Sequence, residues 1–532
     1  MKARTVVWAC VVIMLFSAFL VPSCLLSEVS DSQTGSLSAY QKIEDFRYLF
    51  SKVAAYYPYL ELKVRTEGFD WLAHRGAFER MVRNSRNDED FAEAIGRIVN
   101  SLNNCHTHVM PGWMYRYYEN DPVWWEEAAK TSQERVDYWN SLSLQALGEP
   151  GLRPFVAEYI AGEYVVTSVA PEIAVTSGIH PGLRVLAVNG VPVHDFVASH
   201  RGRWFLAYDP DRKTLFEFEL RFSVEPNTVD FVDPQGRCLA VDVGWAKSVW
   251  TPSFSYSLPR MYAATQEILM TTIEWQGVES GYLYIPTMKS DWQSDTARLR
   301  EFFESIRHLS ALIIDIRGNG GGNDAYWRTN LVYALDGPNK EAENTFYAVR
   351  TKLVEDLGMP VGETKAQFAA RAGKLKDNVP REVWGSDFST PVVYGWPSGS
   401  DRRSVPFDGQ IYVLTSRANF SSAEAFAAYC KASGFATLVG TTTGGDGISK
   451  MPGIVVLPNS GIAIRLRLTM GLNPDLTANE EFHTEPDVAV EQSLEDLVAW
   501  LNWIEEFGPA AEPMPSFDTV LRTCLELIAR SE

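Results

Sequence analysis

The sequence of 532 residues lacks an excess of basic residues: 48 Lys and Arg stand against 67 Asp and Glu, for a formal net charge of −19. Nucleic acid binding requires a basic surface that neutralises phosphates, so no nucleic-acid partner is expected. A repeat of fixed period is also absent. With 46% hydrophobic and 12% aromatic residues, the chain is not disordered in composition. Its length favours about two to four domains.

Long apolar runs are absent beyond the N-terminus. There, Lys2 and Arg4 precede an apolar run over residues 6–21. This pattern is typical of a secretory signal and is shorter than a membrane span. We therefore expect residues 1–24 to be a signal peptide and the protein to be exported, periplasmic or extracellular. The four residues that end at Cys24 resemble a bacterial lipobox, which would attach the protein to the membrane through a lipidated Cys24. Plain signal cleavage nearby is the alternative.

Cysteine is scarce, with six in the whole chain, two of them in the signal region. The other four are widely and irregularly spaced, which is typical neither of a disulfide framework nor of a zinc site. We expect these to be buried free thiols, and we expect no cofactor or metal: Cys105, Cys238, Cys430 and Cys524.

Residues 37–150 are predicted to form an N-terminal helical region. Phe46, Leu49, Phe50 and Val53 recur at the i, i+3, i+4 and i+7 positions of one helix face. The aromatic stretch over residues 113–139 is either a packed linker or a wall that faces a substrate.

Residues 151–245 change to short β-like runs. In the stretch 177–190, a Pro-Gly and an Asn-Gly pair bracket an alternating strand, Arg184 to Val188. This stretch resembles the middle of a PDZ domain, although a generic hairpin is the alternative. The resemblance implies a domain that adds an extended peptide to a sheet edge, often by capturing its terminal carboxylate. The strand near residues 164–169 is the candidate edge.

Residues 275–505 alternate strands and helices, which predicts an α/β domain. Four apolar strands are expected there, at residues 281–285, 311–316, 411–415 and 437–440. The charged insertion at about 337–404 is interpreted as a lid or a partner surface. A C-terminal helix is expected within residues 510–532.

Two segments of this domain carry candidate chemistry. Ser421 stands where a strand ends and a helix begins, so free N–H groups and the helix dipole lie near its hydroxyl. The alternative is an ordinary capping box with Glu424. The run Gly320–Gly322 follows a buried strand and exposes backbone amides that fit an oxyanion hole. It lacks the Lys-Ser/Thr of a nucleotide-binding loop.

Together these segments carry a resemblance to a known family. Leu312–Gly322 is similar to the strand and loop signature of the C-terminal-processing peptidases, and Val413–Phe426 is similar to their nucleophile segment. In that family the catalytic serine lies three residues before a glutamate, which implies Ser421. The resemblance implies a multidomain α/β protein with a crotonase-like, βαβ-rich catalytic domain and serine-type peptidase activity. It also implies protein or peptide substrates, recognised near a C-terminus.

The residue that would activate Ser421 differs from the one used in one branch of the family. The processing branch uses a lysine 25 residues after the serine, and that position holds Asp446; Lys450 is out of register. The tricorn-core branch instead uses a histidine from the N-terminal region and a late glutamate. Residues 102–109 resemble its histidine motif, which implies His106 as the base. Residues 480–487 resemble its late segment, which implies Glu480.

These resemblances imply that His106 takes the proton of Ser421 and that Glu480 orients the imidazole. With His106 as the base, kcat/KM should rise with pH through an apparent pKa of roughly 6–7 and then level off. The oxyanion would be held by N–H groups drawn from Gly321, Gly322 and Ser422. The second choices for site positions are Glu481, His108 and Cys105. A metal pair at the two histidines is an alternative without an obvious third ligand.

Departures from the family's motifs keep a second function open. They occur at Asn104, Cys105, Asp446 and His483. Interphotoreceptor retinoid-binding proteins share the family's fold and bind apolar ligands, so a catalytically silent ligand- or peptide-binding protein is the alternative hypothesis. A third hypothesis is a peptide-binding scaffold that uses only the PDZ-like segment.

Overall fold

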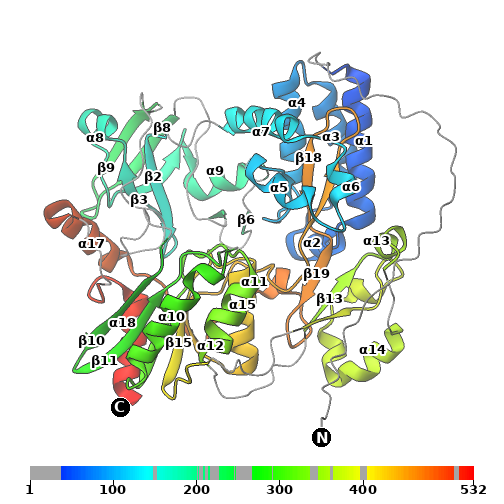
Figure 1. Cartoon of the computed structure of the whole chain (residues 1–532). Coiled ribbons are helices and arrows are strands. Elements are labelled where there is room, and N and C mark those ends of the chain that lie inside the picture. Colours follow the sequence, from blue (N-terminus) through cyan, green and yellow to red (C-terminus); the bar gives the residue numbers. More distant parts are fainter. Residues whose placement is uncertain are drawn as a thin grey trace, which may run out of the picture. The chain divides into compact units, whose positions relative to one another are not determined.

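The computed structural model describes residues 37–147, 153–200, 202, 208–209, 214–215, 227–244, 246, 267–289, 291–335, 345–359, 363–395, 404–508 and 514–531 (Figure 1). The expected signal peptide and Cys24 lie outside these ranges. The described residues combine helices with several separate sheets, so the predicted multidomain α/β class is confirmed at this level.

The N-terminal region is helical as predicted. Its α-helices are α1 (Ala39–Tyr56), α2 (Leu60–Glu67), α3 (Arg75–Arg83), α4 (Asp88–Asn100), α5 (Gly112–Glu119), α6 (Trp125–Ala128) and α7 (Gln133–Leu147). Helix α1 begins with a capping box between Ser38 and Gln41. Its predicted apolar face is buried at Phe46, Leu49 and Val53. The turn after α4 leads into the short strand β1 (His108–Val109), which contains the second histidine of the His-Thr-His motif.

The next region is an antiparallel sheet of order β2-β3-β4-β8-β9. Its strands are β2 (Phe155–Ile160), β3 (Glu163–Val169), β4 (Arg184–Val188), β8 (Asn227–Val232) and β9 (Cys238–Val243). The predicted strand and turn are confirmed: Asn189 and Gly190 both have positive φ between β4 and β5 (Val191–Pro192), as a tight hairpin requires. The prediction that residues 164–169 form an edge strand was wrong, because they lie in β3, between β2 and β4.

The C-terminal half is built on a six-stranded sheet of order β10-β11-β12-β15-β16-β20. Its strands are β10 (Leu269–Trp275), β11 (Val278–Tyr284), β12 (Ala311–Asp315), β15 (Gln410–Thr415), β16 (Thr437–Gly440) and β20 (Val488–Ala489). Strands β11 to β20 are parallel and only β10 is antiparallel. The four apolar strands predicted from the sequence are therefore confirmed.

Helices cover both faces of this sheet (Figure 1). One face packs against α10 (Gln293–Ile306), α11 (Asp324–Trp327) and α15 (Ser422–Ser433). The other packs against α18 (Thr519–Ser531), the expected C-terminal helix, through Leu521, Cys524 and Ile528. Helix α17 (Leu494–Phe507) packs instead against β2 and β3. Because the sheet is buried on both sides, the loops at the carboxyl ends of its strands are left to carry the site.

The described part of the insertion packs into a core and does not stand apart as a lid. Its described elements are β13 (Thr345–Val349), α13 (Thr351–Asp356), α14 (Lys365–Ala372) and β14 (Val392–Tyr394). Phe346, Leu353 and Phe368 are buried in the same hydrophobic core as Phe46 and Leu49 of α1. Strand β13 also pairs with β19 (Thr469–Leu472). The insertion is thus part of the support for the N-terminal helices.

A third small sheet, of order β1-β18-β17, joins the two halves of the sequence. Strand β18 (Ala463–Leu466) pairs with β1 on one side and with β17 (Gly453–Val456) on the other. The pair His108↔Arg465 fixes the register of β1. Through this pairing the histidine motif is held beside the C-terminal half of the chain.

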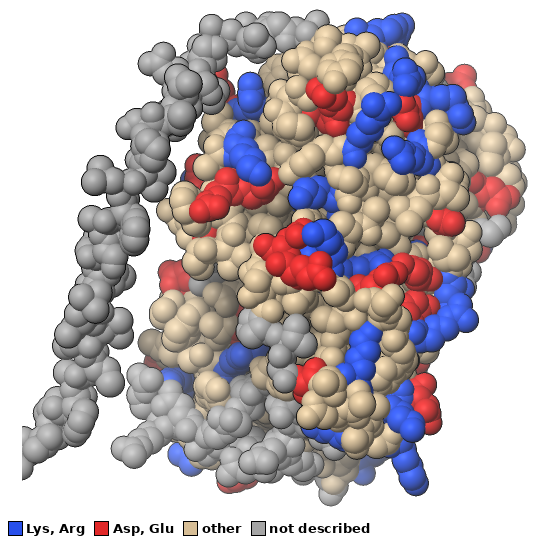
Figure 2. Space-filling view, turned by 90° about the vertical axis from the view of Figure 1, so that its right-hand side faces the viewer, with Lys and Arg blue, Asp and Glu red and all other residues tan. Residues whose placement is uncertain are grey.

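On the face that Figure 2 shows, Lys and Arg side chains lie among Asp and Glu side chains and form no continuous basic patch. In the described part of the chain, no helix is long and apolar enough to cross a membrane. Of the four described cysteines, Cys430 and Cys524 are buried, Cys105 is partly buried and Cys238 is exposed. The expectation of buried thiols is wrong for Cys238.

Candidate active site

Ser421 lies in a sharp turn between β15 and α15. Its backbone has φ +57° and ψ −122°, a region that a residue with a side chain occupies only when its surroundings impose it. The Ser421 N–H donates to the carbonyl of Gly445 (3.2 Å), and the amide side chain of Asn419 accepts from the N–H of Ser416 (2.7 Å). This strand–turn–helix geometry is the one that presents a nucleophilic hydroxyl at the top of a parallel sheet.

The capping-box alternative does not form. The side chain of Ser421 caps no N–H of α15. Glu424 is buried and turned away: one of its carboxylate oxygens accepts hydrogen bonds from Asn479 and Thr484, both at 2.7 Å. The Ser421 hydroxyl is therefore available for a different partner.

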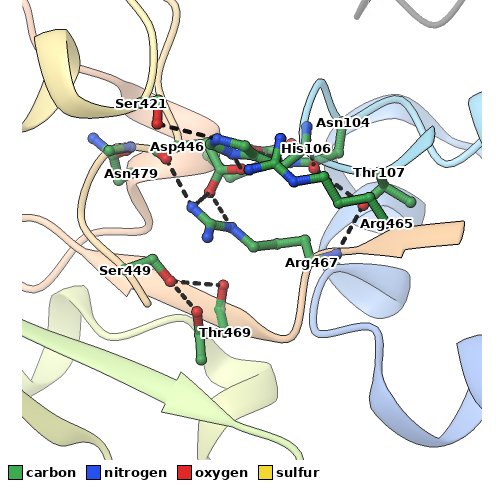
Figure 3. A network of polar contacts seen from close by, with 12 residues as sticks. Asn104, His106, Thr107, Ser421, Asp446, Ser449, Arg465, Arg467, Thr469 and Asn479 are labelled. Atoms are coloured by element: carbon green, nitrogen blue, oxygen red, sulfur yellow. Dashed lines mark hydrogen bonds and ion pairs between the residues drawn. The ribbon is translucent and has the colours of Figure 1, made fainter. Parts of the chain in front are cut away.

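That partner is His106 (Figure 3). Its Nε2 lies 3.1 Å from the Ser421 Oγ, and its Nδ1 lies 2.6 Å from a carboxylate oxygen of Asp446. An ionised carboxylate only accepts hydrogen bonds, so Nδ1 carries the proton and Nε2 faces the hydroxyl as an acceptor. The imidazole is buried, with its centroid 4.4 Å from that of the Phe420 ring.

The environment keeps His106 neutral. Burial lowers its pKa to about 3, with a further lowering from the charge of Arg467 and an opposing effect of Asp446. A neutral imidazole at neutral pH is the form that can accept a proton.

Asp446 is held by four donors. One carboxylate oxygen accepts from Arg467 Nε (2.7 Å) and Tyr59 Oη (3.2 Å), and the other accepts from His106 and from Asn104 Nδ2 (3.0 Å). Burial alone raises the pKa of Asp446, but the charge of Arg467 and the contact with His106 outweigh it and hold the pKa below its usual range. The carboxylate is therefore ionised, although it is 2% exposed.

Glu480 does not take the place expected for it. Its carboxylate lies 2.8 Å from Lys63 Nζ and accepts a hydrogen bond from Asn104 Nδ2 (3.1 Å). Burial raises its pKa to about 7, with Lys63 opposing this shift. Asp446, rather than Glu480, contacts the imidazole, and Asn104 bridges the two carboxylates. The second choice, Glu481, pairs with Arg65 (2.6 Å).

The glycine run approaches the nucleophile closely. A Cβ on Gly321 would lie 2.7 Å from the Cβ of Ser421 and 2.9 Å from the backbone nitrogen of Ser422, so no larger residue fits. The Gly321 N–H already donates to Asn319 Oδ1 (2.9 Å). The expectation that it serves an oxyanion is therefore corrected. Among the described residues, the N–H groups of Gly322 and Ser422 have no acceptor.

The remaining predicted positions lie nearby without contacting the Ser421 hydroxyl. His108 Nδ1 is 2.9 Å from the carbonyl of Val109. His483 bridges the carbonyls of Thr443 (2.9 Å) and Glu480 (3.1 Å). Cys105 is partly buried and forms no disulfide with another described cysteine. Lys450 is exposed, and its backbone carbonyl accepts from Arg467 Nη1 (2.6 Å).

Sequence reasoning missed Asp446 and Arg467. Asp446 was interpreted only as a lost lysine, although it lies in the Gly444–Gly445 loop that approaches the serine. A carboxylate at that position, together with a histidine motif lacking a partner, was the available signal. Arg467 gave no signal, because its role depends on the pairing of β18 with β1.

Comparison with known proteins finds a family match for part of the chain. Residues 279–490 match the model of peptidase family S41. No curated protein matches the chain. Among solved structures, mature CPAF complexed with lactacystin matches with 16% identity and a TM-score of 0.59, over 88% of this chain and 98% of that chain. The photosystem II D1 C-terminal processing protease matches with 17% identity and a TM-score of 0.38, over 89% and 98%.

At these identities the likeness to CPAF supports the fold, which extends over most of the chain. The match over residues 279–490 includes the glycine run, the strand–turn–helix around Ser421 and Glu480. The chain is a serine-type peptidase. Its residues 279–490 match peptidase family S41, in agreement with the resemblance to the C-terminal-processing and tricorn-core peptidases.

Proposed function

We propose that this protein hydrolyses peptide bonds through a triad of Ser421, His106 and Asp446. The observation that carries the proposal is the continuous pair of contacts from the Ser421 Oγ to His106 Nε2 (3.1 Å) and from His106 Nδ1 to Asp446 (2.6 Å). It is supported by the strained backbone conformation of Ser421, because the Ser421 side chain makes no capping hydrogen bond that would explain this conformation.

In the proposed reaction, His106 Nε2 takes the hydroxyl proton as Ser421 Oγ attacks the scissile carbonyl. The imidazolium that forms is stabilised by Asp446, which also fixes the tautomer. His106 then returns the proton to the leaving amine, and a water molecule repeats the sequence on the acyl-enzyme. Arg467 keeps Asp446 ionised throughout, because it contacts the same carboxylate at 2.7 Å.

Backbone N–H groups would hold the oxyanion. Ser422 is the first residue of α15, so its N–H is free of helical hydrogen bonds and lies at the positive end of the helix dipole. Gly322 supplies the second N–H from the loop that follows β12. Two such donors in a fixed position stabilise the tetrahedral intermediate.

The rest of the chain would deliver the substrate. We propose that residues 151–245 form a PDZ-like domain that binds an extended peptide near its C-terminus, and that residues 275–505 form a crotonase-like catalytic domain. Because β3 is paired on both sides, the edge strands β2 and β9 are the remaining candidates for peptide addition. We also propose that the protein is exported, with its N-terminal residues acting as a signal.

The proposal is tested with Ser421→Ala and His106→Ala. A fluorophosphonate probe should label the parent protein and fail to label Ser421→Ala. His106→Ala should lose about 10³-fold or more in kcat on casein-derived peptides, because the serine then lacks a base. His108→Ala is the matched control and should lose far less. A folded parent protein that neither takes the probe nor cleaves would leave the silent binding protein as the better function.

A further inference from the structure

Two arginines, one in β18 and one just after it, lie near the imidazole, and among the described residues only one of them has an anionic partner. Arg465 lies in β18 and Arg467 follows its end, so their side chains are two residues apart on the same face. Arg467 is 2% exposed and its three guanidinium nitrogens contact Asp446 and the carbonyl of Lys450. Arg465 makes no ion pair with any described carboxylate.

Arg465 is nevertheless fixed in position. Its Nε donates to the Tyr118 hydroxyl at 3.2 Å. Tyr118 is buried, and its hydroxyl donates in turn to the carbonyl of Pro452 (2.9 Å). Tyr118 lies on α5 and Pro452 just before β17, so the guanidinium is held between two elements of the N-terminal and C-terminal halves. This leaves its Nη1 and Nη2 atoms pointing away from the anchored edge.

Those two nitrogens are available to a ligand. Neither makes a hydrogen bond to a described residue, and neither is among the buried polar atoms that lack a partner. They are therefore reachable from solvent, and Arg465 as a whole is partly exposed. A guanidinium edge with two parallel N–H groups matches the two oxygens of a carboxylate.

The same guanidinium lies close to the proposed catalytic residues. Arg465 is paired across the strands with His108, so both side chains emerge on one face of the small sheet. His106 lies two residues before His108, and the charge of Arg465 contributes to lowering the pKa of both histidines. Figure 3 shows the Arg465 side chain beside His106 and Arg467.

We propose that Arg465 binds a carboxylate of the peptide substrate beside the scissile bond. The carboxylate belongs either to the C-terminal residue or to an acidic side chain. This inference rests on the proposed function and adds its substrate class. A chain with a net charge of −19 repels anionic peptides as a whole, so a local cation is needed where one is to be bound.

The test compares matched peptides at pH 8, where His106 is neutral. Casein is digested by the parent protein, the cut sites are mapped by mass spectrometry, and peptides are made around the best site. Each is prepared with Asp or Glu against Asn or Gln, and with a free against an amidated C-terminus. The parent should favour one carboxylate form by about 10- to 100-fold in kcat/KM, as expected for a charge-assisted bidentate pair.

Arg465→Gln should bring this ratio close to one, and Arg465→Lys should keep part of it. Arg116→Gln, an equal change of charge at an exposed position of α5, is the matched control and should keep the parent ratio. The free or amidated C-terminus tells which source supplies the carboxylate. A parent without a preference, or a preference that survives Arg465→Gln, would overturn the inference. The parent protein and Arg465→Gln are also labelled with the fluorophosphonate probe. If both are labelled, the serine is active and only the inference about Arg465 is overturned. If the parent is not labelled, the proposed function itself fails, and the inference fails with it.

Discussion

Replacing Asp446 by Asn tests the triad most directly. Four donors face the carboxylate: Arg467, Tyr59, His106 and Asn104. An amide has one acceptor oxygen where the carboxylate has two. The two donors that face the other position would then meet the N–H groups of the amide instead of an acceptor. The charged guanidinium is the strongest donor and should take the amide oxygen.

The amide nitrogen would then face His106 Nδ1. The imidazole can accept this N–H only in the tautomer whose proton is on Nε2, and that proton would point at the Ser421 hydroxyl. Ser421 would lose its base while keeping its position, which predicts a loss of about 10³- to 10⁴-fold in kcat. The buried Arg467 would also lose its counter-charge, which should lower the free energy of unfolding by about 3–5 kcal/mol.

The measurement combines peptide cleavage, the rate of fluorophosphonate labelling and denaturant unfolding. Adding Arg467→Met to Asp446→Asn removes both buried charges, so it should recover part of the stability and none of the activity. Glu480→Gln is the matched control, because Glu480 contacts Asn104 and Lys63 and not the imidazole. A folded Asp446→Asn protein within tenfold of the parent in kcat, or an equal loss in Glu480→Gln, would refute the triad.

Two further predictions concern pH. Because burial lowers the pKa of His106 to about 3, kcat/KM should not fall between pH 8 and pH 5 through protonation of His106, whereas an ordinary histidine base would make it fall near pH 6–7. Any fall in kcat/KM near pH 7 should vanish in Glu480→Gln, since the pKa of Glu480 is about 7. Burial raises the pKa of Glu158 to about 8, so its stabilising contribution is complete below about pH 4.5 and is lost as pH rises to 8. Between pH 5 and pH 9, the free energy of unfolding should therefore fall by about 3–5 kcal/mol less in Glu158→Gln than in the parent, as measured by denaturant titration.

The sequence predicts the parts of the fold that depend on local pattern. The helix face of α1, the parallel strands β11, β12, β15 and β16, and the hairpin at Asn189–Gly190 each follow from periodicity or turn residues close together in the chain. The burial of the insertion against α1 was not predictable in this way. It depends on pairing between β13 and β19, which are more than a hundred residues apart.

The same limit applies to the site. Ser421 and His106 could be inferred because each lies in a short motif, and the structure brings them together across 315 residues. The orienting carboxylate could not be chosen on motif alone, since Glu480 and Asp446 both lie near Asn104. What separates them is the contact that the fold gives each side chain: Asp446 lies 2.6 Å from His106 Nδ1, whereas Glu480 pairs with Lys63. These contacts join distant parts of the chain and have no local sequence signature.

The exchange of lysine for aspartate at position 446 has a physical explanation in this site. The side chain there is buried against Arg467, whose guanidinium is itself 2% exposed. A lysine at this position would place a second cation beside Arg467 with no counter-charge, so it would have to be neutral or displace the arginine. Aspartate instead neutralises Arg467 and is held ionised by it. It cannot serve as the base for Ser421 in that state, because its low pKa makes it a poor proton acceptor. It can, however, orient a base, and His106 is placed between it and the serine. Position 446 therefore suits the carboxylate that orients a histidine base, and Arg467 favours that role.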